Sequence, residues 1–268
     1  MNKAVIFDMD GILIDSEMMY HKRMVRYLKH MNIHCPKEEL LSIIGGSYPM
    51  YQRFVKHVLK IEDDVEDFFN DMNNYCGGPF TDYPSILFDH EMETLQRLRQ
   101  DGYRLAVASS SKLDTIHEVL SSCRIDDLFE FYLSGEMFHE SKPHPEIYLT
   151  AAKKMNLSQE DCLVIEDSPY GITAGKRAGM TVIARREERL AFDQSLADHF
   201  FDDYRQLPAL VADWASENKE NDMQKKQKPL HYLQDLLLFL FLIRTSMHLH
   251  AIRVYCQKQS YILHFHHP

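Results

Sequence analysis

Two aspartates stand two residues apart directly after a short apolar segment near the start of the chain. Asp8 and Asp10 follow residues 4–7 (AVIF), and Gly11 comes next. Burying an unpaired carboxylate is costly, so folding alone explains such a pair poorly. Glycine permits a sharp turn or the close approach of a ligand. A strand that ends in paired acids and a turn is typical of a site that combines a nucleophile with a metal ion.

Phosphoryl transfer needs a nucleophile, a proton donor, a cation and hydrogen-bond donors for the transferred oxygens. Further candidates for these roles follow other apolar segments. Ser109 and Ser110 come after residues 104–108, where hydroxyls and the free N–H groups of a helix start would seat a phosphate. Lys142 precedes a rigid Pro-x-Pro turn. Its ammonium would pair with phosphate and keep a neighbouring aspartate ionised.

Glu166 and Asp167 form a second acidic pair, directly after the apolar residues 163–165. One or two carboxylates, waters and substrate phosphate are the ligands that Mg²⁺ usually takes. Each of these four features has an ordinary structural alternative: an acidic turn, a serine helix cap, a surface lysine or an acidic helix cap. The four features follow one another along the chain, each after its own predicted strand, and this order favours a functional site over four unrelated structural roles.

The four segments resemble, in content and in order, the motif set of the haloacid dehalogenase superfamily, over about residues 1–214. Asp15-Ser16-Glu17 and residues 166–172 (EDSPYGI) are similar to the β-phosphoglucomutase-like and phosphatase subgroup, which has a helical C1-type cap. The resemblance implies that Asp8 is the nucleophile that forms an aspartyl-phosphate. It implies that Asp10 is the general acid and then the base. The implied ligands are Asp8, Asp10 through its backbone carbonyl, Glu166 and Asp167 for Mg²⁺, and Ser109, Ser110 and Lys142 for phosphate.

The apolar segments indicate an α/β fold. Short β-rich runs at 4–7, 104–108, 163–165 and 181–184, with a weaker one at 131–133, read as buried parallel strands. Helical patterns at 89–100, 112–122 and 144–156 lie between them. This alternation predicts a Rossmann-like, doubly wound parallel sheet.

Residues 15–89 follow a different pattern, with helical stretches at 18–31, 37–44, 51–59 and 65–75 and no good strand. We therefore expect an all-helical cap domain at 15–89, inserted into a core domain of residues 1–14 and 90–214. Asp15 and residues 82–84 would be its hinges.

Residues 215–268 form an atypical tail. Residues 216–228 are polar and linker-like, and after Met223 six Lys or Arg face one acidic residue, Asp235. One hypothesis is a partner-binding or membrane-surface element at 236–243. Another is an accidental extension of the chain.

Composition and net charge bear on the partners and the location of the protein. The 268 residues carry a net charge of −10, which argues against non-specific nucleic-acid binding. Five cysteines without regular spacing indicate reduced thiols and a cytoplasmic location. We expect a monomer that acts on a small phosphorylated metabolite, without a signal peptide or membrane insertion.

The chemistry we expect is hydrolysis of a small phosphate monoester, a sugar or polyol phosphate. A sugar phosphate mutase is the alternative, and a non-catalytic phosphate-binding protein is a further one. In the mutases an Arg follows a Gly of the cap, where this chain has Tyr48, and Arg53 lies farther on. Tyr cannot replace a bidentate guanidinium clamp, which favours the phosphatase. His21 is a candidate for a substrate hydroxyl, although a solvated helix histidine is its simpler interpretation.

Overall fold

The computed structural model describes residues 2–46, 48–62, 64–190 and 192–217. Residues 1–215 form one compact unit. The expectations for the tail beyond residue 217 concern residues outside this description. Within the described part, no helix has the length and apolar character needed to cross a membrane.

A six-stranded, fully parallel sheet organises the larger part of the unit. Its strands are β1 (Ala4–Phe7), β2 (Arg104–Ser109), β3 (Tyr132–Ser134), β4 (Cys162–Glu166), β5 (Thr181–Arg185) and β6 (His199–Phe201). Their order is β3-β2-β1-β4-β5-β6, a doubly wound arrangement. The predicted fold class is confirmed. Edge strand β6 was not predicted, because three residues with one histidine give no recognisable apolar run.

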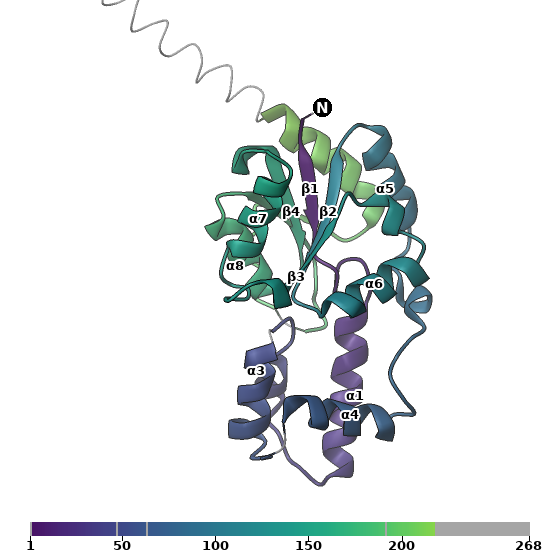
Figure 1. The fold of residues 1–268 in the computed structure, drawn as a ribbon, viewed down its shortest axis with the longest axis vertical. Helices are drawn as coiled ribbons and strands as arrows, with labels where there is room; N and C mark the ends of the chain where they lie inside the picture. The colour runs from purple at the N-terminus through teal and green to yellow at the C-terminus, as the bar shows by residue number, and fades with distance from the viewer. Residues whose placement is uncertain (1, 47, 63, 191, 218–268) are drawn as a thin grey trace, which may run out of the picture. The chain divides into compact units, whose positions relative to one another are not determined.

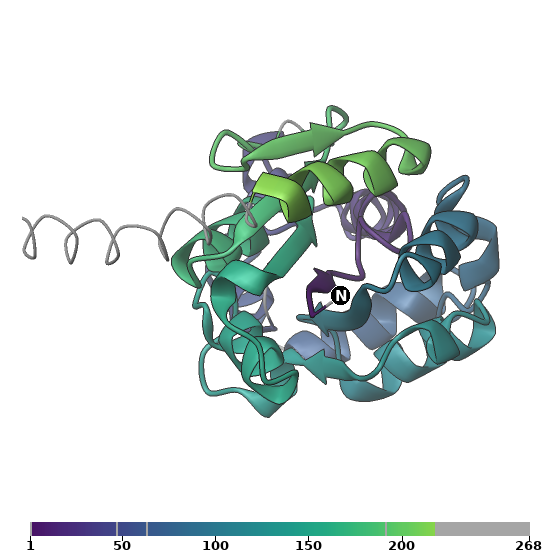
Figure 2. The same ribbon diagram turned by 90° about the horizontal axis from the view of Figure 1, so that it is seen from above.

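Helices cover both faces of this sheet (Figures 1 and 2). On one face lie α5 (Glu91–Gln100), α6 (Leu113–Ser122) and a helix at 207–217; on the other lie α7 (Glu146–Lys154) and α8 (Pro169–Arg177). Strand β1 shows why both faces need cover: Val5 and Phe7 pack on the α5–α6 side, whereas Ala4 and Ile6 pack on the α7–α8 side. An apolar run without polar alternation is what such a strand requires.

Between β1 and α5 the described chain forms several helices joined by turns, as the sequence predicts, and these helices build the lower part of Figure 1. They comprise α1 (Ser16–His30), α2 (Lys37–Leu41), α3 (Tyr48–Arg53), a π-helical turn (Phe54–Val58), α4 (Val65–Tyr75) and a 3₁₀ turn (Tyr83–Ile86). The expected helix at 51–59 begins earlier and divides into α3 and the π turn. These helices share a hydrophobic cluster of their own, which includes Met24, Phe54 and Phe68. We call this segment the cap and keep its bounds, 15–89, as a prediction.

Two chain segments connect the cap with the α/β part, and they run side by side. The Asp15 N–H donates to the Ile86 carbonyl at 2.7 Å, and Ile14 forms an antiparallel bridge with Leu87. Short 3₁₀ turns complete the unit at Asp126–Leu128, Gly135–Met137, Gln159–Asp161 and Tyr204–Gln206.

Candidate active site

The carboxyl ends of β1, β2 and β4 bring the predicted residues together. Phe7 is in register with Val107 of β2 on one side and with Ile165 of β4 on the other. Asp8 and Glu166 therefore follow paired positions, and the Asp8 N–H donates to the Ile165 carbonyl at 2.9 Å. This edge, where the strand order reverses, is where open α/β sheets bind ligands.

Lys142 lies at the centre of this edge. Its Nζ contacts Asp8 Oδ1 at 2.6 Å, Glu166 Oε1 at 2.7 Å and the Ala108 carbonyl at 2.9 Å. Tyr148 of α7 donates its hydroxyl to the same Glu166 oxygen at 2.7 Å. The ammonium thus uses its three protons within the protein, which holds two buried carboxylates side by side.

Burial dominates the electrostatics of this group. It raises the pKa of Asp8 to about 8, although the neighbouring Lys142 acts in the opposite direction. Burial by itself lowers the pKa of Lys142, but the Asp8 and Glu166 carboxylates hold it well above its ordinary value. Asp8, Glu166 and Lys142 therefore form one buried group in which two carboxylates share a single ammonium.

Asp8, Glu166 and Asp167 form a buried acidic cluster, with one ligand oxygen from each lying within 4.8 Å of the others. Glu166 is already saturated, since Oε1 accepts from Lys142 and Tyr148 while Oε2 accepts from two backbone N–H groups and the Ser168 hydroxyl. Both carboxyl oxygens of Asp167 are buried and have no hydrogen-bond partner among the described residues. Burial, and then the neighbouring carboxylates, raises the pKa of Asp167 well above its usual range.

Two glycines make room for this cluster. A Cβ at Gly11, whose φ is +77°, would lie 2.0 Å from Asp167 Oδ2, and one at Gly171 would lie 1.6 Å from Glu166 Oε1. Orphaned, buried carboxylate oxygens beside a backbone that tolerates no side chain are what a hard cation with oxygen ligands requires. The residues therefore fit a bound divalent ion, for which Asp8 and Asp167 have free ligand capacity.

Asp10 faces away from the acidic cluster, toward hydroxyl groups. Its carboxylate accepts from Ser16 Oγ at 2.6 Å and from Ser111 Oγ at 2.6 Å. Its side chain is thus not a member of the candidate metal site, which leaves its backbone carbonyl as the ligand that the resemblance implies. Ser16 and Ser111 had no predicted role, although the serine run at 109–111 was a usable signal.

The three serines at the end of β2 have different positions. Ser109 is fully buried, and its Oγ accepts the Ser111 N–H at 3.0 Å and lies 3.5 Å from Asp10 Oδ2. Ser110 and Ser111 line the cavity described next. The hydroxyl of Ser109 therefore shapes the turn, while its two successors reach the open space.

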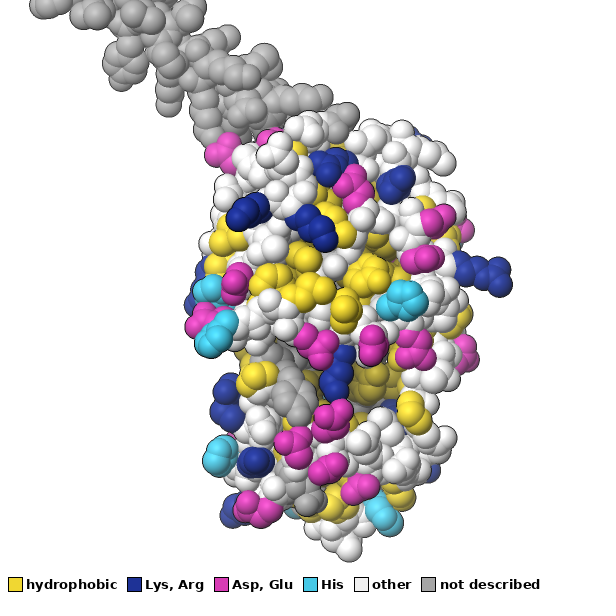
Figure 3. Space-filling model, in the orientation of Figure 1, with side chains coloured by type: hydrophobic (Ala, Val, Ile, Leu, Met, Phe, Trp, Pro, Cys, Tyr) yellow, Lys and Arg dark blue, Asp and Glu magenta, His cyan; other side chains and the backbone are white. Residues whose placement is uncertain are grey.

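A cavity of about 270 Å³ lies between this edge and the cap. The space-filling view shows the surface hollowed between the two parts, with acidic side chains around the hollow (Figure 3). The α/β side contributes Asp8, Asp10, Ser110, Ser111, Lys112, Thr115, Lys142 and Ser168. The cap side contributes Glu17, Tyr20, His21, Met24, Leu40, Ile43, Ile44, Gly45, Gly46, Tyr51 and Phe69.

The structure places the cap candidates unequally. His21 is half-buried and lines the cavity rather than standing free in solvent. Burial, and then Lys37, lowers its pKa. Arg53 is exposed and does not line the cavity. The side chain of Tyr48 lies outside what the structure describes.

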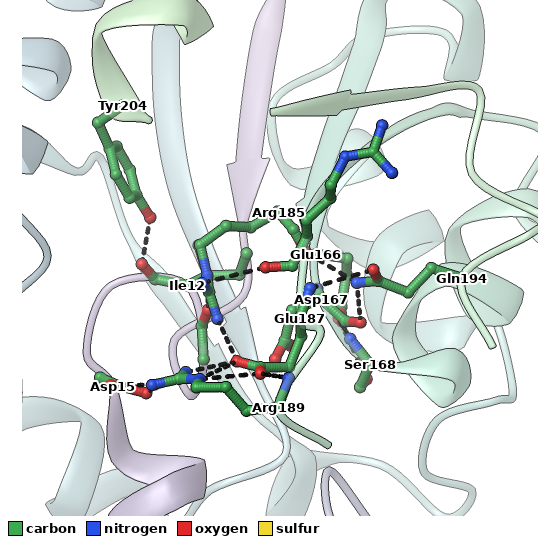
Figure 4. Close-up of polar contacts among 12 residues, drawn as sticks. Ile12, Asp15, Glu166, Asp167, Ser168, Arg185, Glu187, Arg189, Gln194 and Tyr204 are labelled. Carbon is green, nitrogen blue, oxygen red and sulfur yellow. Dashed lines mark hydrogen bonds and ion pairs between the residues drawn. The ribbon is translucent and has the colours of Figure 1, made fainter. Parts of the chain in front are cut away.

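A chain of ion pairs after β5 braces the connection to the cap (Figure 4). Arg185 donates to the Gly11 carbonyl at 2.6 Å and to Glu187 at 2.9 Å. Glu187 also accepts from Arg189, whose guanidinium holds Asp15 through two contacts of 2.7 Å. Burial alone raises the pKa of Glu187, but the hydrogen bonds from the two arginines hold it below its usual value.

Sequence reasoning missed this brace. The run of five charged residues at 185–189 (RREER), directly after a predicted strand, was the available signal. Gln194 extends the brace, since its side-chain amide donates to the carbonyls of Asp167 and Arg185, each at 2.7 Å.

Comparison with known proteins identifies the family. The family model described as "Haloacid dehalogenase-like hydrolase" matches residues 5–185. The chain therefore belongs to this family, and the family and enzyme class predicted from its motifs are confirmed.

Individual relatives are distant but span nearly the same region. The chain is 28% identical over 220 residues to a phosphoglycolate phosphatase of Haemophilus influenzae, covering 78% of this chain and 98% of the relative. It is 28% identical over 182 residues to a phosphorylated carbohydrates phosphatase of Thermotoga maritima, covering 66% and 82%. The crystal structure of β-phosphoglucomutase from Clostridium difficile shares the fold with a TM-score of 0.63 at 24% identity, covering 81% and 99%.

Proposed function

We propose that this protein is a Mg²⁺-dependent phosphatase that hydrolyses a small phosphate monoester, a sugar or polyol phosphate, through an aspartyl-phosphate on Asp8. The observation that carries the proposal is the buried group of Lys142, Asp8 and Asp167, which has no partner among the described residues, beneath the cavity. Relatives named as phosphatases support the class of reaction.

In the first step a carboxylate oxygen of Asp8 attacks phosphorus, and the bond from phosphorus to the ester oxygen breaks. The leaving alkoxide takes a proton from Asp10, so that a neutral alcohol departs. Hydroxyls both donate and accept, so Ser16 and Ser111 can hold Asp10 with or without its proton. This arrangement suits a group that must change its protonation state within one cycle.

In the second step a water attacks phosphorus of the aspartyl-phosphate. Asp10, now a base, takes the proton from this water, and the bond from phosphorus to Asp8 breaks to release phosphate. Lys142 and the hydroxyl and N–H of Ser110 neutralise and hold the phosphoryl oxygens during both steps.

Asp8, Asp167 and the backbone carbonyl of Asp10 would hold Mg²⁺, and Glu166 would contact the ion through water, because its own oxygens already accept hydrogen bonds. When bound, the ion supplies the positive charge that keeps Asp8 ionised and that offsets the charge of the phosphoryl group. Glu166 further serves to anchor Lys142 and Ser168.

A mutase must bind a second phosphate against the cap. Arg53, the nearest arginine to the position at which mutases carry theirs, is exposed and outside the cavity lining. The hydrolase is therefore the function we propose. We further propose that it acts in the cytoplasm as a monomer and binds no nucleic acid.

The test is a screen of phosphorylated metabolites for phosphate release with and without Mg²⁺. We expect hydrolysis of at least one sugar or polyol phosphate, its loss in Asp8→Asn, and full retention in Asp71→Asn, an exposed cap aspartate. A positive screen in which Asp8→Asn remains as active as the wild type contradicts the proposal. Interconversion of hexose phosphates without phosphate release would support the mutase instead.

A further inference from the structure

The cap wall of the cavity is mostly apolar. Its apolar side chains come from α1, from the segment that begins with α2 and from α4: Met24, Leu40, Ile43, Ile44 and Phe69. Phe69 also packs edge-on against the ring of Tyr51, with centroids 5.3 Å apart. A leaving group in contact with this wall gains most if it presents apolar surface of its own.

The polar groups of this wall are the hydroxyls of two tyrosines, the imidazole of His21 and the buried carboxyl of Glu17. Glu17 is buried, and the Gly45 N–H hydrogen-bonds its carboxyl. Burial raises the pKa of both Tyr20 and Tyr51, so their hydroxyls stay protonated. Together these groups offer donors and acceptors to a hydroxyl of the substrate.

No lysine or arginine is present among the residues that the cap contributes to the described cavity lining. His21 does not supply the missing charge, because burial and Lys37 lower its pKa. The two neighbouring positions whose side chains are not described, Ser47 and Tyr48, are not basic either. An anion bound against the cap would therefore meet no counter-charge from the described cap lining.

The α/β side of the cavity contributes two lysines, and both are already paired. Lys142 contacts Asp8 and Glu166. Lys112 forms an ion pair of 2.9 Å with Glu66 of α4, in which both side chains are exposed. If Lys112 bound a second anionic group of the substrate, its ion pair with Glu66 would be broken and Glu66 would lose this partner.

We infer that the enzyme selects phosphate monoesters whose leaving group is a neutral, partly apolar alcohol carrying at least one further hydroxyl, and that it rejects esters with a second anionic group. This inference rests on the proposed phosphatase function. The physical reason is that a carboxylate or second phosphate at the cap wall loses its hydration and meets no cation from the described cap lining.

The first measurement compares two esters of equal size that differ in one group. Glycerol phosphate and phosphoglycerate are such a pair, since a terminal CH₂OH in the first is a carboxylate in the second. We expect kcat/KM with Mg²⁺ to be about tenfold or more higher for glycerol phosphate, because burying a carboxylate without a counter-charge costs more than burying a hydroxyl. p-Nitrophenyl phosphate serves as a general ester with a neutral leaving group.

The second measurement adds the missing cation. Thr115 of α6 lines the cavity and is half-buried, whereas His117 of the same helix is exposed and outside it. Thr115→Lys should raise the ratio of phosphoglycerate to glycerol phosphate turnover by about tenfold, as a charge pair replaces an unpaired charge. His117→Lys is the matched control and should leave the ratio unchanged.

The outcomes separate the two claims. If no ester, including p-nitrophenyl phosphate, shows Asp8-dependent hydrolysis, the proposed function itself fails. If hydrolysis occurs but phosphoglycerate is used as well as or better than glycerol phosphate, only the inference about the leaving group is overturned. Loss of such a preference in Lys112→Met would then identify Lys112 as the cation that binds the second anion.

Discussion

The ammonium of Lys142 lies 2.6 Å from Asp8 Oδ1, with both side chains almost fully buried. The same Nζ is 2.7 Å from Glu166 Oε1. One cation is thus shared by two carboxylates that belong to neighbouring strand ends. Its removal affects folding as well as chemistry, and these two effects can be separated experimentally.

Lys142→Met should abolish phosphatase activity and lower the free energy of unfolding by about 3 kcal/mol or more, because it leaves buried carboxylates unpaired. Adding Glu166→Gln should recover part of the stability without recovering activity, since one of the orphaned charges is then gone. Urea denaturation and steady-state kinetics measure the two quantities. A Lys142→Met protein as stable as the wild type would argue against the shared ion pair.

Gly171→Ala should weaken Mg²⁺ activation, because the new Cβ would lie 1.6 Å from Glu166 Oε1 and must displace that side chain. Gly175→Ala in the same helix is the control, since its Cβ would meet Val182 at 2.7 Å, away from the acidic cluster. Both variants should lose thermal stability. Only Gly171→Ala should need more Mg²⁺ for half-maximal activity, and an equal Mg²⁺ requirement in the two would refute the steric argument.

Glu91 predicts a pH dependence of stability. It is buried at the start of α5 and has no ion pair among the described residues, and burial raises its pKa well above the ordinary value. The folded state therefore binds a proton that the unfolded state releases above its own pKa, near 4.5. The contribution of Glu91 to the free energy of unfolding is therefore fully present below that pH. It is lost as the pH rises toward the pKa of Glu91 in the folded state.

Glu91→Gln removes this titration, so its stability relative to wild type should increase between pH 5 and pH 8. The gain is at most about 1.4 kcal/mol per pH unit. Urea denaturation at several pH values measures it. Glu93→Gln changes an exposed residue of the same helix, and its stability should vary with pH as that of the wild type does. Parallel curves for Glu91→Gln itself would show that Glu91 is ionised in the folded protein.

The bidentate contact between Arg189 and Asp15 predicts an effect on turnover more than on stability. The side chains are 42% and 28% exposed, so the pair contributes about 0.2–1 kcal/mol to folding. Because Asp15 begins the connection to the cap, Arg189→Gln should change kcat and KM together, by up to about an order of magnitude. A double-mutant cycle with Asp15→Asn tests the pairing. Purely additive effects on kcat/KM would show that the contact does not act through the cap.

Deleting residues 219–268 should leave phosphatase activity and solubility intact. All candidate site residues precede this segment, and the last described helix, at 207–217, buries Val211 and Trp214 in the core. Activity assays and size-exclusion chromatography of the shortened chain provide the test. A large loss of activity would show that the tail has a role in the enzyme.

Sequence patterns predicted most of the α/β part because parallel strands buried on both faces must be apolar runs. Asp8, Ser109 and Glu166 were placed correctly at strand ends, since each directly follows such a run. The short edge strand β6 escaped prediction because it is only partly buried. The division of α3 from its π turn escaped it because the π turn is only five residues long, too short for its periodicity to be told from that of an α-helix.

Local sequence therefore determined the family, the fold class and the types of chemical group at the site, because these depend on residue order and apolar periodicity. Only the tertiary structure decided which hydrogen-bond partners each of these groups has. It saturates Glu166 with donors while leaving Asp167 without partners, and it turns Asp10 toward Ser16 and Ser111. It also brings Arg189 to Asp15 from 174 positions away. Such contacts depend on where distant segments meet in space, which no local pattern specifies.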